Sequence, residues 1–78
     1  MPRFYFHIRD GESYELDTVG AEFDSLDLAR RDACLAAREI IAEKLMAGDV
    51  LDGQRFEITD ETGVRVETVV FRSVLNIQ

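Results

Sequence analysis

The sequence has a single cysteine, Cys34, and a single histidine, His7, among its 78 residues. One cysteine cannot form an internal disulfide bond or supply a Cys-x-x-Cys pair for metal binding or redox chemistry. One histidine with no second histidine or cysteine nearby in sequence cannot build a zinc site from local residues. We therefore expect no metal and no cofactor, and we interpret Cys34 as a small apolar side chain on a helix flank.

Long apolar segments are also missing. The chain has no apolar run of roughly 18 residues, and its Met-Pro-Arg start lacks the apolar stretch of a secretory signal. These absences predict a cytoplasmic protein without a membrane segment. With only 78 residues we expect one domain spanning residues 1–78. A core of this size leaves only about 3–5 kcal/mol of net stability, so self-association would be a natural supplement.

Basic residues are scarce: nine Lys and Arg stand against sixteen Asp and Glu, which gives a net charge of −7. Such a charge repels polyanions at long range, so we do not expect a nucleic-acid partner unless the basic residues share one face.

The first segment alternates between apolar and polar side chains from Arg3 to Arg9, which predicts a half-buried strand. The expected inner row is Phe4, Phe6 and Ile8, and the outer row is Arg3, Tyr5, His7 and Arg9. Asp10-Gly11 predicts a type I′ hairpin turn, followed by a shorter strand over residues 13–16. The pattern fades over residues 17–23, which indicates a connection anchored by Val19 and Phe23.

A long helix is predicted next, because Asp24 or Ser25 can cap its start and Gly48 can end it after about Ala47. One side of this helix is apolar and should face the sheet. Its members are Leu26, Ala29, Ala33, Ala37, Ile40 and Ile41.

A second hairpin is predicted after the Asp52-Gly53 turn, with strands over residues 55–60 and 64–71 and Gly63 in the left-handed region. Without a bulge, Ile58 would face Val66 and Phe56 would face Thr68. The side chains expected to point outward are Arg55, Glu57, Arg65 and Glu67. Residues 72–78 should form a closing turn that packs Val74, Leu75 and Ile77 on the core. The expected fold is α+β, in the order ββαββ, with a four-stranded antiparallel sheet packed on one long helix.

The helix has a second apolar stripe opposite the sheet-facing side, made of Leu28, Leu35, Ala42 and Met46. Its flanking residues are Arg31 and Arg38 on one edge and Asp32, Glu39 and Glu43 on the other. We call this surface the outer helix face. An apolar stripe on a solvent-facing side favours a partner, and opposite charges on its edges favour a second copy of the chain. Isolated surface leucines with a chance spacing are the alternative interpretation.

Two other functions can be formulated from the sequence. The row Arg3, Tyr5, His7 and Arg9 has the mixture of rings and guanidinium groups that binds single-stranded nucleic acid, although exposed strands often carry such mixtures. Pro2 would become the first residue after removal of Met1, and a terminal proline before a strand is similar to the small tautomerases, where proline moves protons. The predicted hairpin after the first strand disagrees with the parallel topology of that family.

Three blocks of the sequence together resemble a family of short bacterial proteins known only as a domain of unknown function. They are the opening Met-Pro-Arg-Phe-Tyr-Phe-His-Ile-Arg-Asp-Gly, the helix start Leu-Asp-Leu-Ala-Arg at residues 26–30, and Leu-Asp-Gly-Gln-Arg-Phe-Glu-Ile-Thr-Asp-Glu-Thr-Gly at residues 51–63. The resemblance implies the ββαββ order and a bacterial, intracellular setting, and it transfers no catalytic residues. We expect a non-enzymatic module for protein interaction that forms a homodimer, with protein partners ahead of nucleic acid.

Overall fold

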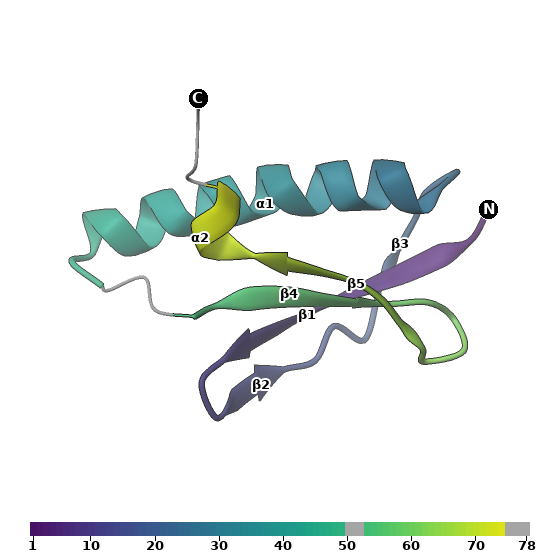
Figure 1. Cartoon of the computed structure of the whole chain (residues 1–78), viewed down its shortest axis with the longest axis horizontal. Helices are drawn as coiled ribbons and strands as arrows, with labels where there is room; N and C mark the ends of the chain where they lie inside the picture. Colours follow the sequence, from purple (N-terminus) through teal and green to yellow (C-terminus); the bar gives the residue numbers. More distant parts are fainter. Residues whose placement is uncertain (50–52, 75–78) are drawn as a thin grey trace.

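A computed structural model describes residues 1–49 and 53–74 as a sheet with one long helix packed across one face (Figure 1). The elements are β1 (Arg3–Asp10), β2 (Ser13–Glu15), β3 (Ala21–Glu22), α1 (Leu26–Met46), β4 (Arg55–Thr59), β5 (Arg65–Val70) and α2 (Phe71–Val74). The predicted α+β class and ββαββ order are confirmed. The short strand β3 was expected to be part of a connection, because two residues are too few to show a period of two.

The sheet is antiparallel in the order β2-β1-β4-β5, and β3 pairs with β1 as well. Residues Ile8 to Asp10 of β1 pair with β2, whereas Arg3 and Phe4 pair with β3. The two short strands therefore support opposite ends of β1. Because β1 and β4 occupy the middle of the sheet, their inward side chains lie beneath α1 and supply much of the core.

The turn between β1 and β2 differs from the predicted type. Asp10 pairs with Ser13, so the two loop residues are Gly11 and Glu12. Gly11 has a φ of 62°, and no residue other than glycine has a positive φ among those that the structure describes. Glycine at the first loop position followed by a residue with negative φ is the pattern of a type II′ turn, so the type I′ prediction is wrong.

Helix α1 begins and ends close to the predicted positions. The Ser25 hydroxyl accepts a hydrogen bond from the Leu28 amide, which identifies Ser25 rather than Asp24 as the cap. Gly48 has a φ of 83° and ends the helix. Four residues of the predicted sheet-facing side are fully buried, namely Ala29, Ala33, Ala37 and Ile41, and Leu26 and Ile40 pack against them. The small alanines let the helix approach the sheet closely, with aromatic rings filling the remaining space.

The pairing of β4 and β5 contains a bulge that shifts the predicted register. Phe56 pairs with Val69 and Ile58 with Glu67, and the register shifts between Ile58 and Thr59, which leaves Val66 as the extra residue. The predicted pairs of Phe56 with Thr68 and Ile58 with Val66 are therefore wrong. The shift also turns Glu67 toward the helix, where its carboxylate lies 3.3 Å from Arg30 Nε, so Glu67 does not point outward as predicted.

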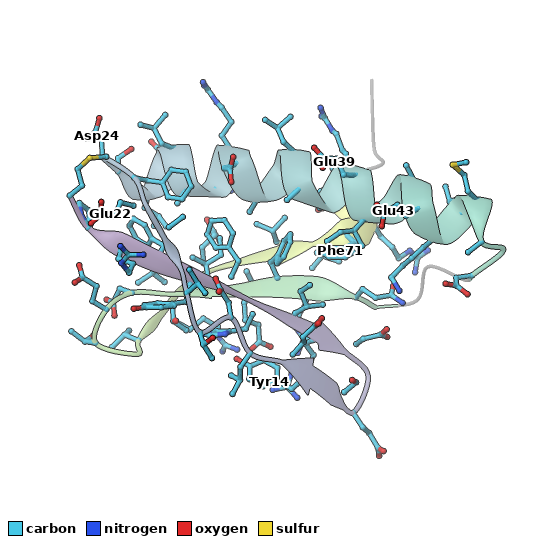
Figure 2. All side chains as sticks on the ribbon, turned by 180° about the vertical axis from the view of Figure 1, so that it is seen from behind. Tyr14, Glu22, Asp24, Glu39, Glu43 and Phe71 are labelled. Carbon is cyan, nitrogen blue, oxygen red and sulfur yellow. The ribbon has the colours of Figure 1, made fainter. Side chains whose placement is uncertain are left out.

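The closing segment packs on the core as helix α2. Phe71 and Val74 are buried, and the Phe71 ring stands edge-on to Phe56 with 5.1 Å between the ring centroids. Figure 2 shows Phe71 between α1 and the sheet. The Phe71 amide also donates to the Gln54 carbonyl oxygen at 2.9 Å. The predicted packing of Leu75 and Ile77, and the position of Asp52, lie outside the described residues.

Candidate functional sites

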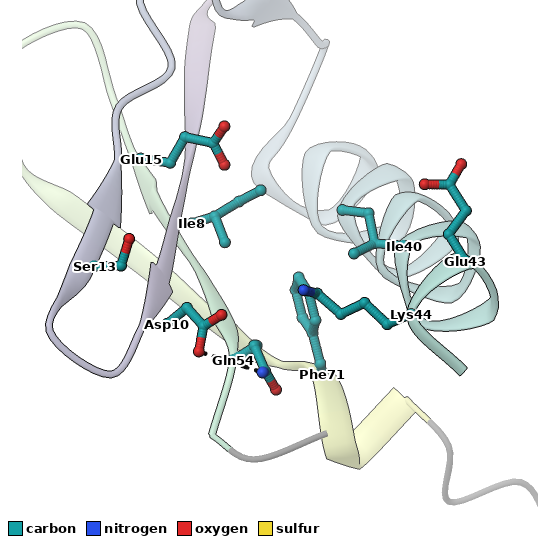
Figure 3. A pocket seen from close by; sticks show the side chains of 9 residues that line it. All are labelled: Ile8, Asp10, Ser13, Glu15, Ile40, Glu43, Lys44, Gln54 and Phe71. Atoms are coloured by element: carbon teal, nitrogen blue, oxygen red, sulfur yellow. Dashed lines mark hydrogen bonds between the residues drawn. The ribbon is translucent and has the colours of Figure 1, made fainter. Parts of the chain in front are cut away.

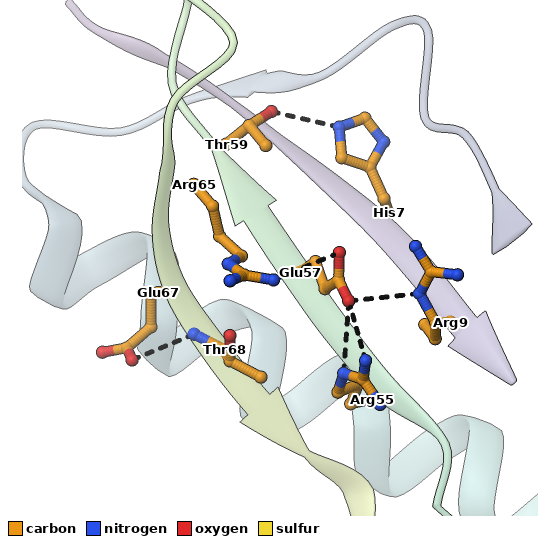
Figure 4. A network of polar contacts seen from close by, with 8 residues as sticks. All are labelled: His7, Arg9, Arg55, Glu57, Thr59, Arg65, Glu67 and Thr68. Carbon is orange, nitrogen blue, oxygen red and sulfur yellow. Dashed lines mark hydrogen bonds and ion pairs between the residues drawn. The ribbon is translucent and has the colours of Figure 1, made fainter. Parts of the chain in front are cut away.

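The sheet face away from α1 carries a buried carboxylate, Glu57, with three arginines around it (Figure 4). The Glu57 carboxylate lies 3.3 Å from Arg9 Nε, 3.1 Å from an Arg55 terminal nitrogen and 3.7 Å from an Arg65 terminal nitrogen. The Glu57 side chain is only 7% exposed, whereas the arginines are partly exposed. Three cations on one anion give this patch a local positive charge on a protein of net charge −7.

The arginines keep Glu57 ionised. Burial raises the pKa of the Glu57 carboxyl, but the Arg9 hydrogen bond and the charges of Arg9, Arg55 and Arg65 outweigh burial, so the pKa lies below its usual value. Arg9 also lies over the Tyr14 ring, with its guanidinium carbon 4.2 Å from the ring centroid. The cluster therefore holds its guanidinium groups in defined positions on the outer sheet face.

A second polar network connects β1 to the segment between β2 and β3. The Asp17 carboxylate accepts hydrogen bonds from the amides of Phe6, Val19 and Gly20, each at 3.0 Å. The Phe6 amide lies on the edge of β1 between the parts paired with β2 and β3, so Asp17 satisfies a donor that neither short strand reaches. Burial raises the pKa of Asp17, but these three hydrogen bonds together outweigh it, and the pKa lies below its usual value.

His7 belongs to the same network. Its Nδ1 accepts a hydrogen bond from the Asp17 amide at 3.0 Å, and its Nε2 lies 3.0 Å from the Thr59 hydroxyl oxygen. Because Nδ1 accepts, the neutral ring carries its proton on Nε2 and donates it to Thr59. The buried His7 is therefore a structural residue that connects β4 to the segment after β2.

All four residues proposed for nucleic-acid binding interact within the chain. Arg3 donates to the Val19 carbonyl oxygen at 2.9 Å and lies 3.6 Å from the Glu22 carboxylate. The Tyr5 ring stacks on the buried His7 ring, with 6.4 Å between centroids. Arg9 is part of the Glu57 cluster, where its Nε donates to the Glu57 carboxylate at 3.3 Å. The structure therefore does not assemble these four side chains into one open stacking surface.

The two predicted anchors of the connection, Val19 and Phe23, differ in whether they pack on the core. Phe23 packs on Phe6 with 5.9 Å between ring centroids, as expected. Val19 is exposed, so its prediction as an anchor is wrong, and only its backbone carbonyl contributes by accepting from Arg3. Gly20 fills the tightest position of this segment: it has a φ of 72°, and a Cβ there would lie 2.9 Å from the Phe4 carbonyl oxygen.

The outer helix face is exposed over its whole length. Leu28 is 41% exposed, Leu35 is 50% exposed and Met46 is 89% exposed, and Ala42 is exposed as well. Within the described residues none of the flanking charges forms an ion pair; these are Arg31, Asp32, Arg38, Glu39 and Glu43. The apolar stripe and its charged edges are thus available to a partner.

A cleft of about 330 Å³ opens between the β1–β2 hairpin and the second half of α1 (Figure 3). Its apolar lining comes from three different elements: Ile8 and Ile40 are partly exposed, and the fully buried Phe71 lies behind them. Polar side chains of the hairpin and of α1 line its walls. This cleft was not predicted from the sequence.

The hairpin register explains why the sheet wall of the cleft is polar. Glu15 pairs with Ile8 and Ser13 pairs with Asp10, so these four side chains point to the helix side of the sheet. A strand that packs on a core would carry apolar residues there, and β2 carries Ser13 and Glu15 instead. This polar inner row is a signal that could have indicated the cleft from the sequence.

Pro2 is exposed and does not line the cleft, and its carbonyl oxygen accepts a hydrogen bond from the Phe23 amide at 3.1 Å. β1 pairs antiparallel with β2, β3 and β4, unlike the parallel arrangement of the small tautomerases. Across residues 1–49 and 53–74 no three acidic, histidine or cysteine side chains gather closely enough to hold a metal ion. Neither helix in these ranges has the length and apolar character needed to span a bilayer.

The fold and its surfaces define a two-layer α+β arrangement with an exposed apolar helix face, an arginine-rich outer sheet face and an acidic cleft. A family model described as Domain of unknown function (DUF6894) matches residues 3–72, and the chain belongs to this family. No curated protein and no solved structure matches the chain. The predicted resemblance to an uncharacterised family is confirmed.

Proposed function

We propose that this chain is a non-enzymatic self-association module, in which two copies pair through the outer helix face. The observation that carries the proposal is the exposure of Leu28, Leu35 and Met46 along one line of α1, between edges of opposite charge. Burying such side chains against a copy removes apolar surface from water without exposing any other part of the core.

The size of the surface predicts a weak dimer. A helix of 21 residues presents a strip about 31 Å long and roughly 10 Å wide, because each residue adds about 1.5 Å along the axis. The area of this strip is well below the roughly 800 Å² that each partner buries in a standard stable interface. We therefore expect a dissociation constant of about 10 µM or weaker, unless other surfaces join the contact.

The change Leu35→Glu is expected to weaken the dimer by at least about tenfold, because it places two carboxylates in the apolar centre of the interface. Sedimentation equilibrium over a wide range of protein concentrations measures this change. Leu16→Glu is the matched control, since Leu16 is 63% exposed but lies directly after β2 and is not part of α1. A wild-type chain that stays monomeric at the highest concentration, or equal weakening by both variants, contradicts the proposal.

The charged edges also predict how the two helices are oriented. In a parallel pair the basic edge of one helix meets the acidic edge of the other, and Arg38 lies at nearly the same height as the partner's Glu39. In an antiparallel pair each edge meets its own copy, so the basic edges would face each other. The charge pattern therefore favours the parallel arrangement.

Arg38→Glu distinguishes the two orientations. In the parallel pair it should weaken association by about twofold to fivefold, as expected for two exposed ion pairs, and Arg38→Glu combined with Glu39→Arg should restore it. In an antiparallel pair the same single change removes a like-charge contact and should strengthen association. The measurement is sedimentation equilibrium at low and high salt, because screening should shrink either effect.

A further inference from the structure

We propose that the cleft between β2 and α1 binds a short aliphatic diamine, with the methylene chain on the apolar floor and the ammonium groups at the carboxylates of the walls. The cleft shares Glu43 with the acidic edge of the outer helix face but none of its apolar stripe, so diamine binding does not require dimer formation. Three features of the cleft carry the proposal: its charge, its floor and the absence of internal partners for its carboxylates.

The charge of the cleft selects a cation. Asp10 and Glu15 lie on the sheet wall and Glu43 lies on the helix wall, and Lys44 is the only basic residue among the described residues of the lining. Three carboxylates and one ammonium group leave a net charge of −2. A cleft lined by one sign of charge concentrates ligands of the opposite sign, and an anionic ligand would be repelled.

The floor selects a ligand with an apolar segment. Ile8 and Ile40 lie between the acidic side chains of the sheet wall and Glu43 of the helix wall, with Phe71 beneath them (Figure 3). An apolar floor with few polar groups at its rim is the usual construction of a small-molecule site, and about 330 Å³ is near the lower end of the usual range. A hydrated metal ion would not use this floor, whereas an alkyl chain would.

The fold does not use the two glutamates of this cleft. Within the part of the chain that the structure describes, neither Glu15 nor Glu43 forms a hydrogen bond or an ion pair through its side chain, and Lys44 forms no ion pair. Asp10 is different, because its carboxylate accepts a hydrogen bond from Gln54 Nε2 at 3.3 Å, which fixes its position. The cleft thus has one oriented carboxylate and two whose charge is available to a ligand from opposite walls.

The proposal is tested by titrating the ¹⁵N-labelled chain with pentane-1,5-diamine at about 0.1 M salt, where screening limits diffuse attraction. We expect saturable shifts confined to the amides around Ser13, Glu15, Glu43 and Gln54. Pentane-1,5-diol has the same chain without charge and should bind at least about tenfold more weakly. The same titration is carried out on Leu35→Glu, which weakens the proposed dimer. Diamine binding that is unchanged in this variant does not depend on dimerisation.

Matched variants identify the wall carboxylates. Glu15→Gln and Glu43→Gln should each weaken diamine binding about threefold to tenfold and leave the spectrum otherwise folded, because both side chains are exposed. Asp27→Asn removes the same charge at the other end of α1 and should leave the affinity unchanged. Equal binding of the diol, shifts spread over the acidic surface without saturation, no shifts, or equal effects of all three variants would each overturn the proposal.

Discussion

Replacing Phe71 by alanine is expected to reduce the free energy of unfolding by about 3–5 kcal/mol, which is close to all of the net stability that a core of this size supplies. Phe71 is fully buried and is among the largest fully buried side chains, together with Ile41 and Ile58. Its ring contacts Phe56 of β4 while its helix packs on α1, so its removal leaves a cavity where three elements meet. We therefore expect Phe71→Ala to be largely unfolded at room temperature.

Urea denaturation followed by circular dichroism, together with the dispersion of the amide proton spectrum, measures this effect. Phe71→Leu fills most of the volume and should lose less than half as much stability as Phe71→Ala. Val70→Ala is the neighbouring control, because Val70 is 39% exposed and its truncation should cost less than about 1 kcal/mol. If Phe71→Ala keeps a wild-type denaturation midpoint, the packing of α2 described above is incorrect.

The second large effect is expected for Asp17→Asn, which should cost about 1–3 kcal/mol although the side chain keeps its shape. The two Asp17 oxygens accept from Phe6 on one side and from Val19 and Gly20 on the other. Asparagine has one acceptor oxygen, so its amide group must face a backbone donor and leave that donor without a partner. The edge of β1 between β2 and β3 should open first, which faster hydrogen exchange of the Phe6 amide would show.

The pH dependence of this variant follows from the direction of the pKa shift. The pKa of Asp17 is lower in the folded chain than in the unfolded chain, because the three amide hydrogen bonds outweigh the effect of burial. Its stabilising contribution is therefore fully present above the ordinary carboxyl pKa of about 4 and is lost as the pH falls through the lower folded value. Glu57 and Asp60, whose pKa values are also lowered, act in the same direction.

The free energy of unfolding should consequently fall less between neutral and acidic pH for Asp17→Asn than for the wild type. The difference between the two proteins should shrink toward zero at the lowest pH at which both still fold. Glu12→Gln removes one carboxylate at an exposed turn position, where the side chain forms no hydrogen bond or ion pair within the described residues, and serves as the control. Parallel curves for Asp17→Asn and the wild type would show that Asp17 does not carry this pH dependence.

The local signals of the sequence predicted α1 well, because each one acts over a few residues. Ser25 caps the start, Gly48 ends the helix, and the spacing of Ala29, Ala33 and Ala37 identifies the buried side. The outer helix face follows from the same periodicity, and its exposure is confirmed. Its use as an interface remains a prediction.

The features that were missed depend on contacts between distant residues. A period of two cannot reveal that Val66 is an extra residue, so the register of β5 was shifted by one and Glu67 was placed on the wrong face. Nothing near Asp17 in sequence indicates that its carboxylate reaches the edge of β1. The cleft could have been found, since the hairpin turn already places Ser13 and Glu15 on the inner side of the sheet.

The bulge in β5 also affects whether the free edge of the sheet can pair with a strand from another chain. β5 is the last strand of the order β2-β1-β4-β5; its extra residue interrupts the regular pairing with β4, and the Glu67 side chain turns inward to contact Arg30. An irregular edge strand with an inward-pointing carboxylate is a poor template for pairing with a strand from another chain. Growth into fibrils by strand addition is thereby disfavoured at this border, and copies that assemble must use a different part of the surface.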